Sequence, residues 1–410
     1  MTTPARAYEA LELPWPPRFS PLGKHPEPQQ SREELVRLNS AVWTVTRLLA
    51  ASSLDVPWYE AKLAIGEAVH ALAEVAATCE ERIAELGARL APPDRAADGP
   101  TAARLAHALA APAAHRLAAL PGQWLTPLLD QFSAASFDPM LDGPSERLRR
   151  RAVSDLDDAF MWFFEAAARF RPAEKESASP HPTAHTPAQR PTMGIRDTRF
   201  RTFESTRDYR KAPGWVTSGS DYTDDLLELV RVNRDEIDAL ETFALALFDL
   251  VEEAPLPVLR HLARLAWDEA RHSACGHALL AEQFGDPYAH ECSMIGIRVR
   301  GGMGGWDAWT QITVFGELGI IGPMRALARE AGRRGDKRTA GAFAFICSDE
   351  TMHLRESRRL LAAYHPLGGL GAAAEAARTR AGRTLETLGL YDAEQFTQLN
   401  ERQIFELLGE

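Results

Sequence analysis

Apolar residues recur at helical spacing through much of the first half of the chain. The stretch 58–90 keeps an apolar stripe of this period and is rich in Ala, Leu and Glu, which favour helix. Prolines and a Gly-Pro step interrupt the pattern within 91–100. Helical periodicity returns in 125–135 and 145–170. The pattern therefore predicts an N-terminal helical unit over residues 1–170.

Longer helical segments follow in the second half of the chain. Apolar periodicity places them at about 221–253, 257–284, 306–333 and 336–364. Short connections join the first segment to the second and the third to the fourth, whereas a longer stretch joins the second to the third. Two antiparallel pairs joined by a crossover make a four-helix bundle. We predict an all-α fold, with a bundle over 221–365 and a helical tail over 366–410.

Residues 171–220 separate the two units and differ from them in composition. Pro, Ser, Thr, His and charged residues dominate this segment, which buries too little apolar surface to order itself. We predict a linker or a loop lying over the surface. Its His181 and His185 are therefore expected to be solvated rather than to bind a metal.

The charge balance narrows the classes of partner. The 46 Lys and Arg residues against 57 Asp and Glu residues leave a formal net charge of −11, which argues against nucleic acid or an anionic membrane as a partner. The sequence shows no targeting segment and no apolar run long enough to span a bilayer, so we expect a cytoplasmic protein. The four cysteines form no Cys-x-x-Cys pair, and reduced thiols are expected.

The chemistry of the chain is concentrated in a motif that occurs twice. Asp-Glu-x-x-His stands in the second helical segment of the bundle, with Glu269 and His272, and again in the fourth, with Glu350 and His353. Residues three apart on a helix share a face, so each Glu and His can bind one metal ion or ions next to each other. The repetition in two helix pairs makes the signal stronger than either motif alone.

Each motif also has a candidate carboxylate on the preceding helical segment. Glu317 precedes Glu350 by 33 positions with the turn midway, so these two residues lie level in an antiparallel hairpin. In the other pair, Glu241 precedes Glu269 by 28 positions with Pro255 at the midpoint. We therefore prefer Glu241 as the ligand from the first helix, and keep Glu236 as the alternative for an asymmetric hairpin.

Carboxylates and imidazoles without sulfur suit a pair of iron ions, with manganese or a mixed iron–manganese pair as alternatives. Asp268 and Asp349 each precede a ligand Glu. A histidine bound to metal commonly donates its second N–H to a carboxylate. We predict that each Asp reaches the His of the opposite motif. In the N-terminal unit, Glu67 and His70 form another Glu-x-x-His, but no second copy accompanies it there, and we predict no metal site in that unit.

At this point the sequence resembles the di-iron carboxylate proteins of the ferritin-like superfamily, whose pattern is Glu, Glu-x-x-His, Glu, Glu-x-x-His on four helices. The resemblance covers about 221–364. The sequence looks closest to poorly characterised bacterial members that have a tryptophan before the first motif, here Trp267, and Gly-Asp before the last helix, here Gly335-Asp336. It implies that Glu269 and Glu350 bridge the metals. The full ligand set it implies is Glu241, Glu269, His272, Glu317, Glu350 and His353.

At several positions the sequence differs from particular members of this superfamily, which narrows the classes of activity that the resemblance implies. Gly276 stands where radical-storing subunits carry Tyr, Ile320 and Ile321 stand where hydroxylases and desaturases often carry Thr, and Ile346 stands where arylamine N-oxygenases carry a seventh ligand, His. Thr313, one turn before Glu317, is the candidate for a proton-delivering hydroxyl, with an ordinary helix threonine as the alternative.

The resemblance implies an oxidoreductase with dioxygen as co-substrate. It would hydroxylate, N-oxygenate or desaturate a small organic substrate close to Glu317 and Thr313, and it would need an external electron donor. A homodimer is compatible with this class. The alternatives are a ferroxidase, peroxidase or manganese-catalase-like protein, and a scaffold that keeps the metal for stability.

Overall fold

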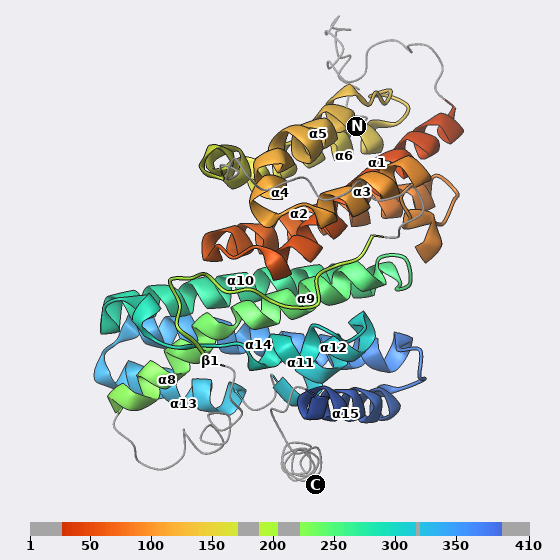
Figure 1. Cartoon of the computed structure of the whole chain (residues 1–410). Coiled ribbons are helices and arrows are strands. Elements are labelled where there is room, and N and C mark those ends of the chain that lie inside the picture. Colours follow the sequence, from red (N-terminus) through yellow and green to blue (C-terminus); the bar gives the residue numbers. More distant parts are fainter. Residues whose placement is uncertain (1–26, 171–187, 204–221, 317–319, 388–410) are drawn as a thin grey trace, which may run out of the picture.

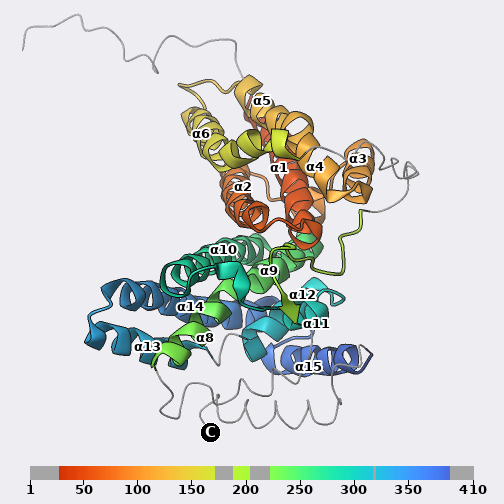
Figure 2. The ribbon, with the colours of Figure 1, turned by 60° about the vertical axis from the view of Figure 1, so that its left-hand side comes forward.

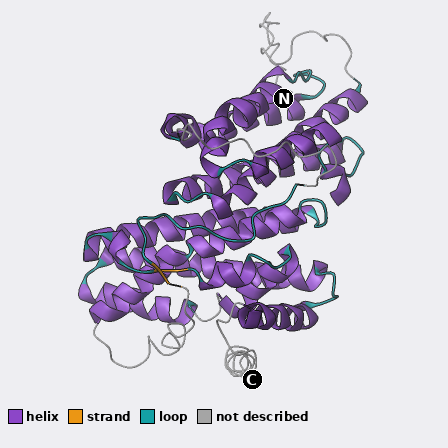
Figure 3. Cartoon of the chain, in the orientation of Figure 1, coloured by secondary structure: helices purple, strands orange, loops and turns teal. Residues whose placement is uncertain are grey.

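The computed structural model is mostly helical, which confirms the all-α prediction, and it describes residues 27–170, 188–203, 222–316 and 320–387. Figure 3 shows that helices make up nearly all of the ordered elements. The helices are α1 (Pro28–Asp55), α2 (Tyr59–Glu85), α3 (Gly99–Ala110), α4 (Ala113–Leu120), α5 (Thr126–Ala134), α6 (Gly143–Ala166), α8 (Tyr222–Asp235), α9 (Ile237–Leu250), α10 (Leu256–Phe284), α11 (Ile295–Arg300), α12 (Gly305–Gln311), α13 (Ile321–Arg334), α14 (Lys337–Tyr364) and α15 (Leu370–Thr387). None of these described helices has both the length and the apolar character needed to cross a membrane.

Short elements complete the described chain. Strands β1 (Thr202–Phe203) and β2 (Cys292–Ser293) form a two-stranded parallel pair. Single 3₁₀ turns occur at Pro92–Arg95, Ala167–Arg169 and Pro287–Ala289. π-Helical turns occur at Pro121–Leu125 and, as η6, at Ile312–Gly316.

The helices are stacked in layers (Figures 1 and 2). α1 packs against α2, and this pair lies on α9 and α10. On the other side, α10 packs against α14, and α14 packs against α13. α8 contacts both α10 and α13, so each of α8, α10, α14 and α13 contacts two of the other three.

Local sequence sets the ends of the hairpin α13–α14. Gly335 follows α13 with φ of 84°, a left-handed conformation that glycine adopts without steric cost. The next residue, Asp336, caps α14 by accepting a hydrogen bond from the backbone N–H of Thr339 at 3.0 Å. This tight turn fixes the height of α14, which carries the second Asp-Glu-x-x-His motif.

Two of the predicted long helices are interrupted. The segment predicted over 221–253 is divided into α8 and α9 at Glu236, which alone breaks the helical run between them. The segment predicted over 306–333 comprises α12, the π-helical turn η6 and α13, with residues 317–319 outside the described part. π-Helical turns are rare and often occur at functional sites.

The N-terminal helices share a hydrophobic core with the second half of the chain. One buried cluster includes Trp43 of α1, Val69 of α2, Phe243 of α9 and Leu262 of α10. The described part of the predicted linker, 188–203, runs along this region in extended form (Figure 1). The predicted His181 and His185 lie outside the described residues.

Candidate metal centre

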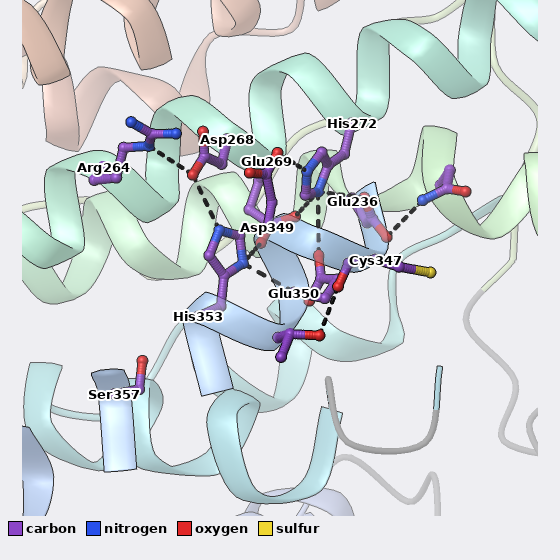
Figure 4. Close-up of polar contacts among 12 residues, drawn as sticks. Glu236, Arg264, Asp268, Glu269, His272, Cys347, Asp349, Glu350, His353 and Ser357 are labelled. Atoms are coloured by element: carbon purple, nitrogen blue, oxygen red, sulfur yellow. Dashed lines mark hydrogen bonds and ion pairs between the residues drawn. The ribbon is translucent and has the colours of Figure 1, made fainter. Parts of the chain in front are cut away.

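Three helical positions bring acidic and imidazole side chains to one buried site (Figure 4). α10 provides Glu269 and His272, and α14 provides Glu350 and His353, each pair on one face of its helix because the residues are three apart. Glu236 joins them from the break between α8 and α9. Within the described residues, Glu236, Glu269, His272 and Glu350 form the one group whose ligand atoms all lie within 4.8 Å of one another.

The Nδ1 atom of His272 faces three carboxylates. It lies 3.1 Å from Glu350 Oε1, 3.3 Å from Glu269 Oε2 and 3.3 Å from Glu236 Oε2. His272 Nδ1 and Glu236 Oε2 are both buried without a hydrogen-bond partner, so these close contacts are not hydrogen bonds. Nitrogen and oxygen atoms that converge in this way could serve as the ligands of a metal ion.

His353 faces the same two central carboxylates from the other side. Its Nδ1 lies 3.3 Å from Glu269 Oε1 and 3.7 Å from Glu350 Oε2, and all three atoms lack a hydrogen-bond partner. Glu269 and Glu350 thus present one oxygen to each histidine. The ring centroids of the two histidines are 5.7 Å apart. This geometry fits a pair of ions that share two carboxylates.

The outer nitrogens of both histidines contact aspartates of the opposite motif. His353 Nε2 lies 3.1 Å from Asp268 Oδ2, and His272 Nε2 lies 3.3 Å from Asp349 Oδ2. This is the crossed pairing that the sequence predicted. An aspartate at Nε2 favours the tautomer with the proton on Nε2, which leaves the Nδ1 lone pair directed at the centre.

The electrostatics of the cluster also favour cations. Burial raises the pKa of Glu236, because little water reaches its carboxylate. Burial opposes a charge on His272 and on His353, but the carboxylates at hydrogen-bond distance, led by Asp349 and Asp268 respectively, raise both pKa values well above normal. Protons thus balance the charge of these buried carboxylates, and divalent ions can replace those protons.

Glu241 does not lie in this cluster, contrary to the sequence-based preference for it over Glu236. Its side chain is fully buried elsewhere, where it accepts hydrogen bonds from Lys62 Nζ of α2 and from Arg196 Nη1, the latter at 2.5 Å. Two cations already neutralise this carboxylate. Glu236, the alternative kept for an asymmetric hairpin, occupies the position instead.

The reason is where the first hairpin turns. α9 ends at Leu250 and α10 begins at Leu256, so the turn is centred at about residue 253 rather than at Pro255. Positions equidistant from the turn lie level in an antiparallel hairpin. Glu269 lies 16 positions after residue 253, and 16 positions before it lies Ile237, next to Glu236.

Of the two residues predicted to act from the third helix, Glu317 and Thr313, the structure describes one. Glu317 lies outside the described residues. Thr313 lies in the π-helical turn η6, is fully buried, and its Oγ1 has no hydrogen-bond partner among the described residues. η6 contacts α14, which carries Glu350 and His353.

The additional motif of the N-terminal unit has ordinary structural contacts. Glu67 is exposed, whereas the ring of His70 stacks on that of Trp267 with centroids 4.6 Å apart. Sequence reasoning missed Lys62 and Arg196 as the partners of Glu241. No local signal identifies them, because they come from α2 and from the segment 188–203.

Comparison with known proteins adds no family assignment, since no protein-family model, curated protein or solved structure matches this chain.

Proposed function

We propose that the second half of the chain is a ferritin-like four-helix bundle that holds a dinuclear metal centre, most favourably di-iron. The first helix of the bundle would be α8 with α9, the second α10, the third α12 with α13, and the fourth α14. In this proposal the protein is an oxidoreductase that uses dioxygen to oxidise a small organic substrate. The observation that carries it is the convergence of both histidine Nδ1 atoms on Glu269 and Glu350, with none of these facing atoms engaged in hydrogen bonds to each other.

The residues divide between the two metal positions. Glu236 and His272 would hold one ion, His353 would hold the other, and Glu269 and Glu350 would contact both. Glu317, from the sequence pattern, is the candidate for the second position. Manganese, or one ion of each metal, suits the same oxygen and nitrogen ligands. Two bound ferrous ions would supply electrons for the reduction of dioxygen.

The remaining work falls to side chains of this chain. Asp268 and Asp349 hold the imidazoles in one orientation and one tautomer. Arg264 and Arg271 in turn donate to Asp268, which keeps that aspartate ionised. Burial of the cluster excludes water, so competing hydrolytic and proton-leak reactions are limited. The Thr313 hydroxyl is the candidate proton donor.

Metal content tests the dinuclear centre. Full-length protein reconstituted with ferrous iron without oxygen should hold about two ions per chain by elemental analysis, because the ligand set exceeds the needs of one ion. His272→Ala and His353→Ala should each lower this value. His277→Ala, on the same helix α10 but stacked on Tyr59, should leave it unchanged. One ion or none in the unsubstituted protein would contradict the dinuclear proposal.

Oxygen consumption separates the candidate activities. Reduced, iron-loaded protein should consume dioxygen in stoichiometric amounts alone and over many turnovers only when a substrate from an amine, amino-acid and fatty-acid panel and an electron donor are present. Repeated oxidation of free ferrous iron without any organic substrate would instead establish a ferroxidase. Stable ferrous iron that never reacts with dioxygen would leave a metal-stabilised scaffold.

A further inference from the structure

A hollow of about 610 Å³ lies between α13 and α14. Its residues on α14 lie both before and after Glu350 in the sequence. Its volume falls in the usual range for sites that bind small organic molecules. The residues that line it are Arg325, Ala328, Arg329, Ala344, Cys347, Ser348, Thr351, Met352 and Arg355.

The inner wall of this hollow adjoins the metal cluster. Cys347 is buried and stands one turn before Glu350 on α14, and Figure 4 shows it beside Glu350 and Glu236. Burial raises the pKa of the Cys347 thiol, and this effect outweighs the opposing charge of Arg325. A neutral, apolar thiol is therefore what separates the hollow from the candidate ligands.

The outer wall is strongly cationic. Arg325, Arg329 and Arg355 are exposed, and among the described residues none of the three forms an ion pair with a carboxylate. Arg325 donates only to the hydroxyl of Thr351, at 2.9 Å. By contrast, Arg334 of α13 contacts Glu330 and Arg359 of α14 contacts Glu356.

Guanidinium groups recognise planar oxyanions through paired N–H donors. Three of them that share one hollow without carboxylate partners provide that recognition, and Ser348 and Thr351 add hydroxyl donors beside them. The other lining groups, Ala328, Ala344, Cys347 and Met352, are apolar. The hollow thus combines three cationic groups with apolar groups, of which Cys347 is buried.

We propose that this hollow is the substrate site and that the substrate is an organic acid, whose carboxylate binds Arg325, Arg329 and Arg355 while its apolar part extends past Met352 to Cys347, next to the metals. This inference rests on the proposed function for its catalytic meaning, but binding of the acid depends only on the residues of the hollow.

Ligand binding to the full-length protein tests the site without any turnover. Octanoate and 3-phenylpropanoate are titrated by calorimetry into metal-free and iron-loaded protein, with 1-octanol and 3-phenylpropanol as neutral analogues. Each acid should bind about tenfold or more tightly than its alcohol, because the alcohol lacks the charge-assisted hydrogen bonds. The triple variant Arg325→Gln/Arg329→Gln/Arg355→Gln should lose this preference.

Two further variants examine charge and shape separately. Arg359→Gln removes a paired arginine from α14 outside the hollow and should bind the acids as the unsubstituted protein does. Ala344→Trp replaces an exposed residue of the wall and should block the acids by filling the space, with the helical circular dichroism unchanged.

The outcomes distinguish this inference from the proposed function. If the acids bind no better than the alcohols, or if the triple variant binds them equally well, the inference is wrong, whatever the metal content. Inorganic phosphate that binds as tightly as octanoate would make the hollow a phosphate site and overturn the organic-acid assignment. Arginine-dependent binding of the acids in a protein that takes up no iron on reconstitution would support the hollow and refute the proposed function.

Discussion

Exchanging Glu241 or Glu236 for glutamine separates a structural carboxylate from a metal ligand. Both side chains lie at or near the start of α9, five residues apart, and glutamine nearly preserves the shape of glutamate. Glu241 is paired with Lys62 and Arg196, whereas Glu236 faces His272. The two substitutions are therefore matched in chemistry and differ only in what the carboxylate contacts.

The cost of Glu241→Gln follows from burial. The side chain of Glu241 is 0% exposed, that of Lys62 1% and that of Arg196 3%, so the substitution leaves buried cations without a counter-charge. Breaking such a pair costs about 3–5 kcal/mol. Lys62 keeps a hydrogen bond to Ser53 O at 2.7 Å, and burial lowers its pKa, so it can lose its proton. Arg196 cannot, and we expect about 3 kcal/mol.

Glu236→Gln should behave in the opposite way. Burial raises the pKa of Glu236, so in metal-free protein an amide replaces a carboxyl group that is already inclined to be neutral. We expect a stability change of about 1 kcal/mol or less in metal-free protein. The metal content should fall, because a ligand oxygen that carries negative charge is lost.

Urea unfolding of chelator-treated protein, followed by circular dichroism, measures the first effect, and iron per folded chain measures the second. Glu241→Gln should lower the urea midpoint and retain iron, and Glu236→Gln should do the reverse. If Glu241→Gln loses iron while its urea midpoint stays unchanged, the ligand assignment drawn from the structure is wrong and the symmetric hairpin is right.

Further tests address the supporting side chains and the packing. Asp349→Asn and Asp268→Asn should each weaken iron binding about 10- to 100-fold in a competition titration with a chelator, since each loses the carboxylate that orients a histidine. Gly276→Ala should lower the free energy of unfolding, measured in urea, by about 1–3 kcal/mol, because a Cβ there would overlap the backbone of α8. Gly341→Ala on α14 meets open space and should raise the free energy of unfolding by about 0.5–1 kcal/mol. Asp142→Asn should lower the stability at pH 7, because hydrogen bonds from neighbouring side chains outweigh burial and hold the pKa of Asp142 below normal. The stabilisation by Asp142 is therefore present above pH 4 and is lost as the pH falls through the lower folded pKa. In acid the variant and the unsubstituted protein should have the same stability.

The overlap at Gly276 explains a feature that the sequence showed only as a departure. At this position of α10 the backbone of α8 lies against Gly276, whereas the radical-storing proteins that the sequence was compared with by resemblance carry Tyr there. A side chain of any size would force α8 away from α10. The close crossing of these helices, with Glu236 at the end of α8, therefore depends on the glycine.

The sequence by itself determined the local part of the site. The spacing of Glu269 and His272, and of Glu350 and His353, places each pair on one helix face, because helix geometry is set by neighbouring residues alone. The crossed contacts of Asp268 and Asp349 also followed, since they need only two antiparallel helices that bring equivalent motifs together. For the same reason the helical class of the fold could be read from apolar periodicity.

Only the tertiary structure decided which first-helix carboxylate joins the site. A shift of about two residues in the centre of one turn moves the level position on the partner helix by about four, which exchanges Glu241 for Glu236. Apolar periodicity does not define a helix end that closely. The partners of Glu241 and the arginine-lined hollow were likewise beyond the sequence, because Lys62 and Arg196 meet Glu241 across separate segments, and a hollow exists only where two helices pack against each other.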